Sequence, residues 1–109
     1  MSSKRAQYTE QLMQDSATAT GNGTALDMDG FNIAMLQVSG ISGDTITIEA
    51  TIDESTWDAW GAKDNADALA TTITADGLYR VDAFAVAQIR ARVSTYSAGT
   101  IIVLGRATA

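Results

Sequence analysis

The sequence predicts an all-β domain: an antiparallel two-sheet β-sandwich, jelly-roll-like, with about eight strands and an extended N-terminal arm. Two observations carry this prediction. Short runs alternate apolar residues with polar ones, many of them threonine, and turns rich in glycine and aspartate separate the runs. These turns recur roughly every 8–15 residues, which is typical of a sandwich. The pattern leaves the strand order open.

Composition narrows the functional classes. A chain of 109 residues suits one domain with one core. Its 13 acidic and 7 basic residues give a formal net charge of −6, so we expect no binding to nucleic acid or to anionic membranes. The chain has no cysteine and no histidine, which removes disulfides, thiol catalysis and most zinc sites. We therefore expect a protein that is not an enzyme and that holds no cofactor or metal.

The first 22 residues of the chain differ from the rest in their residue pattern. We expect residues 1–22 to be an arm and linker and residues 23–109 to be the β-sandwich domain, because residues 16–23 are small and polar. Tyr8, Leu12 and Met13 fall at helical spacing, which predicts a short amphipathic turn that needs a partner surface. A frayed terminus that packs on nothing is the alternative. The sequence shows no signal peptide and no apolar stretch long enough to cross a bilayer, so we expect a soluble protein or part of a soluble assembly.

In the first half of the domain, residues 24–28 predict an edge strand. In residues 31–38, apolar residues occur on both faces of the expected strand, at Ile33 and Met35 and at Leu36 and Val38. This predicts a strand that is buried on both sides or carries a bulge. Residues 45–53 alternate cleanly, with isoleucine and alanine on one face and threonine and glutamate on the other. The glycine-rich turn at residues 40–44 predicts that these last two strands pair as an antiparallel hairpin.

In the second half, residues 57–60 predict a short strand with its two tryptophans on different faces, followed by a loop. Residues 69–74 are rich in threonine and predict an edge strand, and the Asp76-Gly77 turn predicts a hairpin to residues 78–83. Residues 88–95 and 99–107 both alternate and predict a final pair that closes the domain.

Several residues suggest chemistry, and each has a plainer alternative. Asp27 and Asp29 resemble the start of a calcium loop, but the remaining acidic ligands are missing and an ordinary turn explains them. The acidic residues that gather around Trp57 suit glycoside hydrolysis in principle, although carboxylates at turns are common; these are Asp53, Glu54 and Asp58. Trp57 and Trp60 suggest a carbohydrate-binding platform, against the alternative that at least one of them fills the core.

Three arginines lie at outward positions of the late strands: Arg80, Arg90 and Arg92. Asp82 lies on the same face as Arg80, so a charge pair between strands explains this arginine without a ligand. The functional alternative is ionic contact with a neighbouring subunit, because the guanidinium fork suits carboxylates.

Longer stretches resemble the small β-sandwich proteins and domains of tailed bacteriophage virions. In the first half the resemblance lies in residues 23–27, 31–38 and 48–57, and in the second half in residues 76–82, 88–94 and 99–103. It covers about residues 20–109 and is one of pattern, not of a catalytic signature. The family pattern would place Asp-Gly-Thr-Thr-Trp where this chain has residues 53–57, so the turn type there differs.

This resemblance implies a structural role in a virion. It points to a capsid decoration or cement protein that binds the major capsid protein at the capsid surface as a homotrimer, after synthesis in the host cytoplasm. A tail, fibre or neck module is the first alternative, and a carbohydrate-binding module the second. The residues we expect to contact the capsid or a sister subunit are Tyr8, Leu12, Arg80, Arg90 and Arg92.

Overall fold

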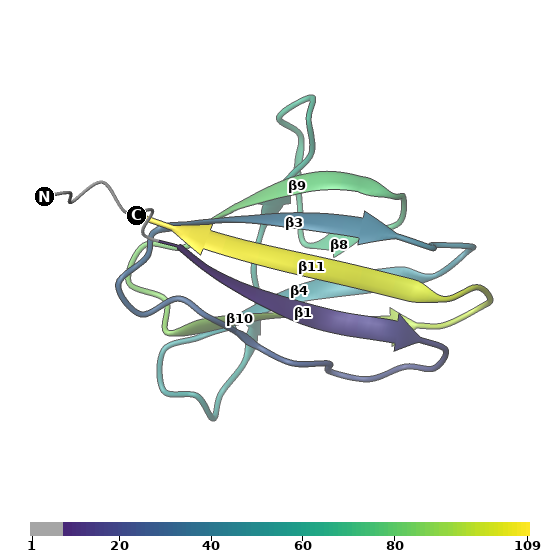
Figure 1. The fold of residues 1–109 in the computed structure, drawn as a ribbon, viewed down its shortest axis with the longest axis horizontal. Coiled ribbons are helices and arrows are strands. Elements are labelled where there is room, and N and C mark those ends of the chain that lie inside the picture. Colours follow the sequence, from purple (N-terminus) through teal and green to yellow (C-terminus); the bar gives the residue numbers. More distant parts are fainter. Residues whose placement is uncertain (1–7) are drawn as a thin grey trace, which may run out of the picture.

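The structure, a computed structural model, describes residues 8–109, which form strands joined by turns and loops (Figure 1). The long strands are β1 (Tyr8–Ala17), β3 (Ile33–Ser39), β4 (Thr45–Thr51), β9 (Gly77–Asp82), β10 (Gln88–Thr95) and β11 (Ile101–Thr108). Five two-residue strands complete the set: β2 (Leu26–Asp27), β5 (Asp58–Ala59), β6 (Ala62–Lys63), β7 (Leu69–Ala70) and β8 (Thr72–Ile73). The expected strand at residues 69–74 is therefore divided into two short strands.

These strands form two antiparallel sheets that pack face to face. One, the six-stranded sheet, has the order β1-β11-β3-β9-β6-β7, and the other, the five-stranded sheet, has the order β2-β10-β4-β5 with β8 also beside β4. Figure 1 shows β1, β11, β3 and β9 in front of β4 and β10. The predicted all-β sandwich is confirmed.

The core lies between the sheets because alternate residues of β3, β4, β10 and β11 point inward. The inward residues are mostly alanine, valine and isoleucine, including Ala34, Leu36, Val38, Ile46, Ile48, Ile89, Ala91, Val93, Ile101 and Val103. Gly105 also faces inward, where a Cβ would lie only 2.5 Å from Met13 Sδ. Glycine at this position therefore makes room for the long Met13 side chain, which is fully buried.

Three connections that the sequence predicts to be hairpins cross from one sheet to the other. β3 belongs to the six-stranded sheet and β4 to the five-stranded sheet, and the same division separates β8 from β9 and β10 from β11. β3 pairs with β9 and β11, whereas β4 pairs with β10. The predicted pairings within these three pairs of neighbouring strands are wrong.

The crossing loops bind one another, which explains why the turns do not make hairpins. The buried Asp44 carboxylate, in the β3–β4 loop, accepts hydrogen bonds from the backbone N–H groups of Ser97 and Ala98 in the β10–β11 loop. Asp76, in the β8–β9 loop, accepts one from the backbone N–H of Ile41 at 2.9 Å. Polar groups that a hairpin would satisfy by strand pairing are satisfied here by a neighbouring loop.

The N-terminal segment differs from the expected helical turn. Tyr8–Ala17 is not a helical turn or an arm but strand β1, which pairs with β11 from Tyr8↔Thr108 to Ala17↔Ile101. Within β1, Gln14 Nε2 donates to the backbone oxygen of Ala91 at 2.7 Å, and beyond β1, Gly21 forms a β-bridge with Val93. Residues 8–22 therefore belong to the sandwich, and residues 1–7 of the expected arm lie outside the described residues.

The described residues contain no helix that is long and apolar enough to span a membrane.

Candidate interaction surface

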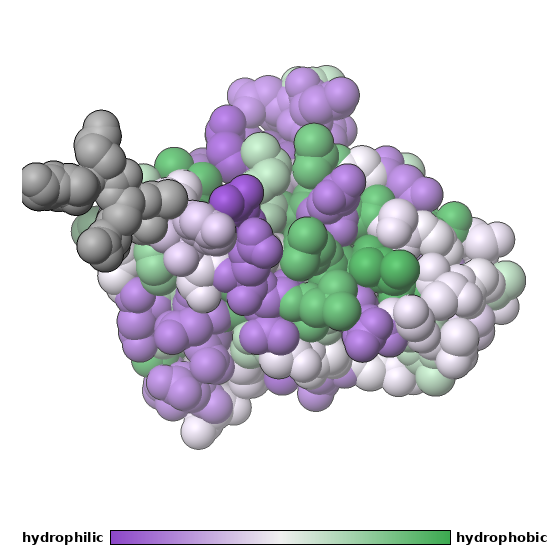
Figure 2. Space-filling view, viewed as in Figure 1, coloured by the Kyte–Doolittle hydropathy of each residue, from purple (hydrophilic) through white to green (hydrophobic). Residues whose placement is uncertain are grey.

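The outer face of the six-stranded sheet exposes a group of large apolar side chains to solvent. Seven large apolar side chains on β1, β3, β9 and β11 are 37–52 % exposed there, and we call them the apolar face: Tyr8, Leu12, Ile33, Met35, Leu78, Ile102 and Leu104. Figure 2 shows hydrophobic residues gathered over β3 and β11, with hydrophilic residues around them. A contiguous apolar patch of this kind marks an interaction site more often than isolated exposed residues do.

Strand register aligns these residues in rows across the sheet. Leu12 lies opposite Leu104 on the neighbouring strand, Leu104 lies opposite Gln37, and Gln37 lies opposite Leu78. Side chains in such rows are direct neighbours on one face of a sheet. Between this row and the next is a shallow hollow of about 220 Å³, lined in part by Met35, Leu78 and Leu104. This hollow can receive a complementary side chain of a partner.

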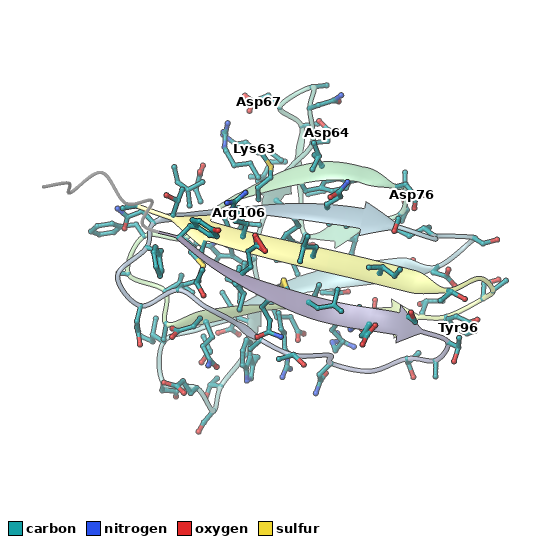
Figure 3. All side chains as sticks on the ribbon, viewed as in Figure 1. Lys63, Asp64, Asp67, Asp76, Tyr96 and Arg106 are labelled. Carbon is teal, nitrogen blue, oxygen red and sulfur yellow. The ribbon has the colours of Figure 1, made fainter. Side chains whose placement is uncertain are left out.

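The next row carries charges. Glu10 lies opposite Arg106, which lies opposite Met35, which lies opposite Arg80. Arg106 Nε is 3.7 Å from a carboxylate oxygen of Glu10, and its guanidinium carbon is 3.8 Å from the centre of the Tyr8 ring. Figure 3 shows Arg106 on β11, toward the C-terminal end of this strand. Arginine and tyrosine beside apolar residues are typical of protein interfaces.

The outer face of the five-stranded sheet is polar and its charges are paired. Glu49 on β4 binds two arginines of β10, with its carboxylate oxygens 2.8 Å from Arg90 Nε and 3.1 Å from Arg92 Nε. The Arg90 guanidinium also lies 4.1 Å from the centre of the Trp57 ring. These contacts hold the arginines within the chain. The two faces of the sandwich therefore differ in chemical character.

The structure divides the residues expected to make contacts. Tyr8, Leu12 and Arg80 lie together on the outer face of the six-stranded sheet, whereas Arg90 and Arg92 lie on the opposite sheet beside Glu49. The expected pair of Arg80 with Asp82 is present, with Arg80 Nε 3.4 Å from the carboxylate. Glu49, as the shared partner of two arginines, was not predicted.

Sequence reasoning missed most of the apolar face. The expectation that residues 31–38 are buried on both sides or carry a bulge is wrong. β3 alternates regularly, pairs with β9 and β11 in a continuous register, and exposes its outward residues Ile33 and Met35. The available signal was the presence of apolar residues at both alternating positions of residues 31–36 and 101–104. Such a sequence fits a strand whose second face is covered by a partner protein as well as one whose second face is covered by its own domain.

The carboxylates that were candidates for catalysis or calcium binding hold turns in place. One Asp53 oxygen accepts hydrogen bonds from the backbone N–H groups of Thr56 and Ser55 at 2.7 and 2.8 Å and from the Thr51 hydroxyl at 3.0 Å. These donors lower the pKa of Asp53 to about 2. Asp27 accepts from the backbone N–H of Asp29 at 3.0 Å, as in an ordinary turn. Among residues 8–109, no three acidic side chains gather closely enough to suggest a metal site.

The two tryptophans lie in different surroundings, on either side of the short strand β5 in the sequence. Trp57 is half-buried and covered by Arg90, whereas Trp60 is 38 % exposed and its indole N–H donates to the backbone oxygen of Asp82 at 2.8 Å. Trp60 therefore lies beside β9 of the six-stranded sheet. Among the described residues, a cation covers the Trp57 ring, and none covers the Trp60 ring.

Solved structures of other proteins have a similar fold. No protein-family model matches the chain, and no curated protein matches its sequence. Solved structures that resemble it include the SPBc2 prophage-derived protein YomS, with a TM-score of 0.85 and 16 % sequence identity over 98 % of this chain and 97 % of that chain. The PBSX exported protein XepA has a TM-score of 0.88 and 14 % identity over 98 % of this chain but only 39 % of that chain. At these identities the likeness establishes that the chain shares the fold of YomS and of the matched part of XepA.

Proposed function

We propose that this protein is a non-enzymatic structural protein of a phage virion and that its apolar face docks on another virion protein. The observation that carries the proposal is the contrast between its two sheets. The outer face of the six-stranded sheet exposes leucine, isoleucine and methionine, while Glu49, Arg90 and Arg92 make the opposite face polar and internally paired. Seven large apolar side chains gathered on one outer face are typical of a surface that a protein partner covers.

The structural neighbours support the phage origin. One is described as an SPBc2 prophage-derived protein and matches over nearly its entire length, and the other is described as an exported protein of PBSX. The pattern that resembles virion sandwich proteins supports the same origin from the sequence alone.

Within this class we propose a capsid decoration role, with the major capsid protein as partner. Many copies of a rigid sandwich, each burying its apolar face on the shell, would stabilise neighbouring capsid subunits. We further propose a homotrimer at the capsid surface, because small closed oligomers suit the symmetry axes of a shell. Tyr8, Leu12 and Arg80 would belong to the capsid-facing surface. Arg90 and Arg92, on the opposite sheet, would then face away from the shell or toward a sister subunit.

Copy number tests the proposed location. The purified protein is mixed with empty capsids of its source phage, the particles are sedimented, and the bound protein is measured by gel densitometry. A decoration protein will saturate at hundreds of copies per particle, because it occupies every equivalent site of the shell. Saturation at about a dozen copies would move the protein to the neck or tail, and no binding to capsids or complete virions would contradict the virion role itself.

A further inference from the structure

A second feature of the surface is a hollow at the edge of the six-stranded sheet, where β9 meets β6 and β7. It has a volume of about 310 Å³ and is lined by Trp60, Gly61, Lys63, Leu69, Arg80 and Asp82. This volume is near the lower end for small-molecule sites and suits a ligand of one ring. The hollow lies beside the apolar face and shares none of its seven residues.

Trp60 forms a fixed wall of this hollow. Its backbone N–H donates to the backbone oxygen of Ile48 at 2.9 Å, and its indole N–H donates to that of Asp82 at 2.8 Å. Both N–H groups of the residue are therefore satisfied within the chain, while 38 % of its surface remains exposed. A rigid, exposed indole can stack on the apolar C–H face of a ligand without losing a hydrogen bond or much rotational freedom.

Leu69 provides further apolar surface in the hollow, and Gly61 leaves room for the Leu69 side chain. A Cβ at position 61 would lie 2.6 Å from Leu69 Cδ1, so any side chain there would push Leu69 away from its present place. Leu69 is itself 65 % exposed, which means that its position serves no closed core. The glycine therefore sets the shape of the hollow.

The polar groups of the hollow are only loosely paired. Arg80 Nε is 3.4 Å from Asp82, Arg80 Nη2 is 3.4 Å from Asp67, and Lys63 Nζ is 3.8 Å from Asp67. Figure 3 shows Lys63 and Asp67 beyond the edge of β9. Strong charge-assisted hydrogen bonds are about 2.7–2.9 Å long, as is the 2.8 Å contact of Arg90 with Glu49. Lys63, Arg80 and Asp82 thus retain donors and acceptors for a ligand.

This combination points to one class of ligand. A hexopyranose has an apolar C–H face for the tryptophan and hydroxyl groups that both donate and accept, which match ammonium, guanidinium and carboxylate groups. The two cations, Lys63 and Arg80, are balanced by Asp67 and Asp82, so the site favours a neutral sugar over an anionic one. We infer that the hollow beside Trp60 binds a neutral hexopyranose unit of a glycan.

Tryptophan fluorescence tests this inference on the full chain. Because the chain has two tryptophans, Trp57→Phe leaves Trp60 as the single reporter. This variant is titrated with the methyl glycosides of glucose, galactose and mannose, with N-acetylglucosamine, and with glucuronic acid as the anionic comparison. We expect at least one neutral sugar to change the Trp60 emission saturably, with a dissociation constant of the order of millimolar for a single ring. No saturable change with any neutral sugar, or a response to glucuronic acid alone, would overturn the inference.

Variants locate the binding by sugar-detected NMR, which does not depend on the reporter. Trp60→Ala should weaken binding at least roughly tenfold, whereas Trp60→Phe, which keeps an aromatic ring, should retain most of it. Gly61→Ala leaves the tryptophan in place and should also weaken binding by displacing Leu69. Trp57→Ala is the matched control and should bind the sugar as the native chain does. Undiminished binding by folded Trp60→Ala or Gly61→Ala protein would place the sugar elsewhere and contradict the site. These results do not depend on capsid binding, so the two proposals stand or fall separately.

Discussion

Asp44 and Asp53 each hold a loop by accepting several hydrogen bonds. Burial pushes the pKa of Asp44 upward, but hydrogen bonds from the backbone N–H groups of Ser42, Ser97 and Ala98 outweigh it and leave this pKa below its ordinary value. The backbone donors of Thr56 and Ser55, with the Thr51 hydroxyl, lower the pKa of Asp53 from 3.8 to about 2. Both groups therefore favour the folded state when ionised, and this stabilisation is complete above the unfolded-state pKa.

The stability of the protein should consequently fall in acid. As the pH decreases from 3.8 toward about 2, Asp53 of the unfolded chain takes up its proton first, so the folded state loses its advantage across this range. We predict that Asp53→Asn is less stable than the native protein at pH 7 and that the difference shrinks as the pH falls to about 2. Urea unfolding at several pH values measures this, with Asp58→Asn as the control. A difference that is the same at every pH would show that the charge of Asp53 does not act as described.

At the scale of elements, alternation predicted strands well but could not assign them to sheets. The strands at residues 45–53, 88–95 and 99–107 were expected close to where β4, β10 and β11 lie. Their partners were not predictable, because a short turn with glycine and aspartate suits both a hairpin and a corner between sheets. The deciding contacts, such as Asp44 with Ser97 and Asp76 with Ile41, join residues far apart in the sequence.

Strand β1 was missed for a different reason. Its pairing with β11 shifts between Leu12 and Gln14 and again between Gln14 and Ala17, so its side chains do not alternate. A buried glutamine interrupts the pattern further, because Gln14 points inward to bind the Ala91 backbone oxygen on the other sheet. From the sequence, an irregular edge strand of this kind therefore resembles a short amphipathic turn followed by a polar linker.

Two glycines test how closely the corners are packed. Gly40 and Gly30 have nearly the same positive φ, 86° and 85°, but a Cβ at Gly40 would lie 1.8 Å from the Thr100 backbone oxygen, whereas a Cβ at Gly30 would meet nothing within 4 Å. We predict that Gly30→Ala lowers the free energy of unfolding by about 1 kcal/mol, the cost of the left-handed backbone alone. Gly40→Ala should lower it by more than about 3 kcal/mol, because the β3–β4 and β10–β11 loops must separate. Urea unfolding of both variants compares them, and equal losses would mean that the loops yield easily.

At the scale of the molecule, the sandwich has two unlike faces. One sheet satisfies its outward charges itself, through Glu49 with Arg90 and Arg92, and the other exposes its outward apolar residues. From the sequence, the apolar residues of β3 and β11 were visible, but not that they lie on one continuous surface. That surface arises from the order β1-β11-β3-β9, which brings together segments from both ends of the chain.

The most direct test of the central claim compares one substitution on each face. Leu104→Lys places a charge in the middle of the apolar face, and Thr72→Lys places the same charge at an exposed position of β8 on the opposite sheet. Each variant is checked for native circular dichroism and mixed with particles of the source phage in the sedimentation assay. We predict that Leu104→Lys weakens particle binding at least roughly tenfold, because a lysine cannot be buried without a partner, while Thr72→Lys binds as the native protein does. Native binding by Leu104→Lys would contradict the proposal that the apolar face is the docking surface.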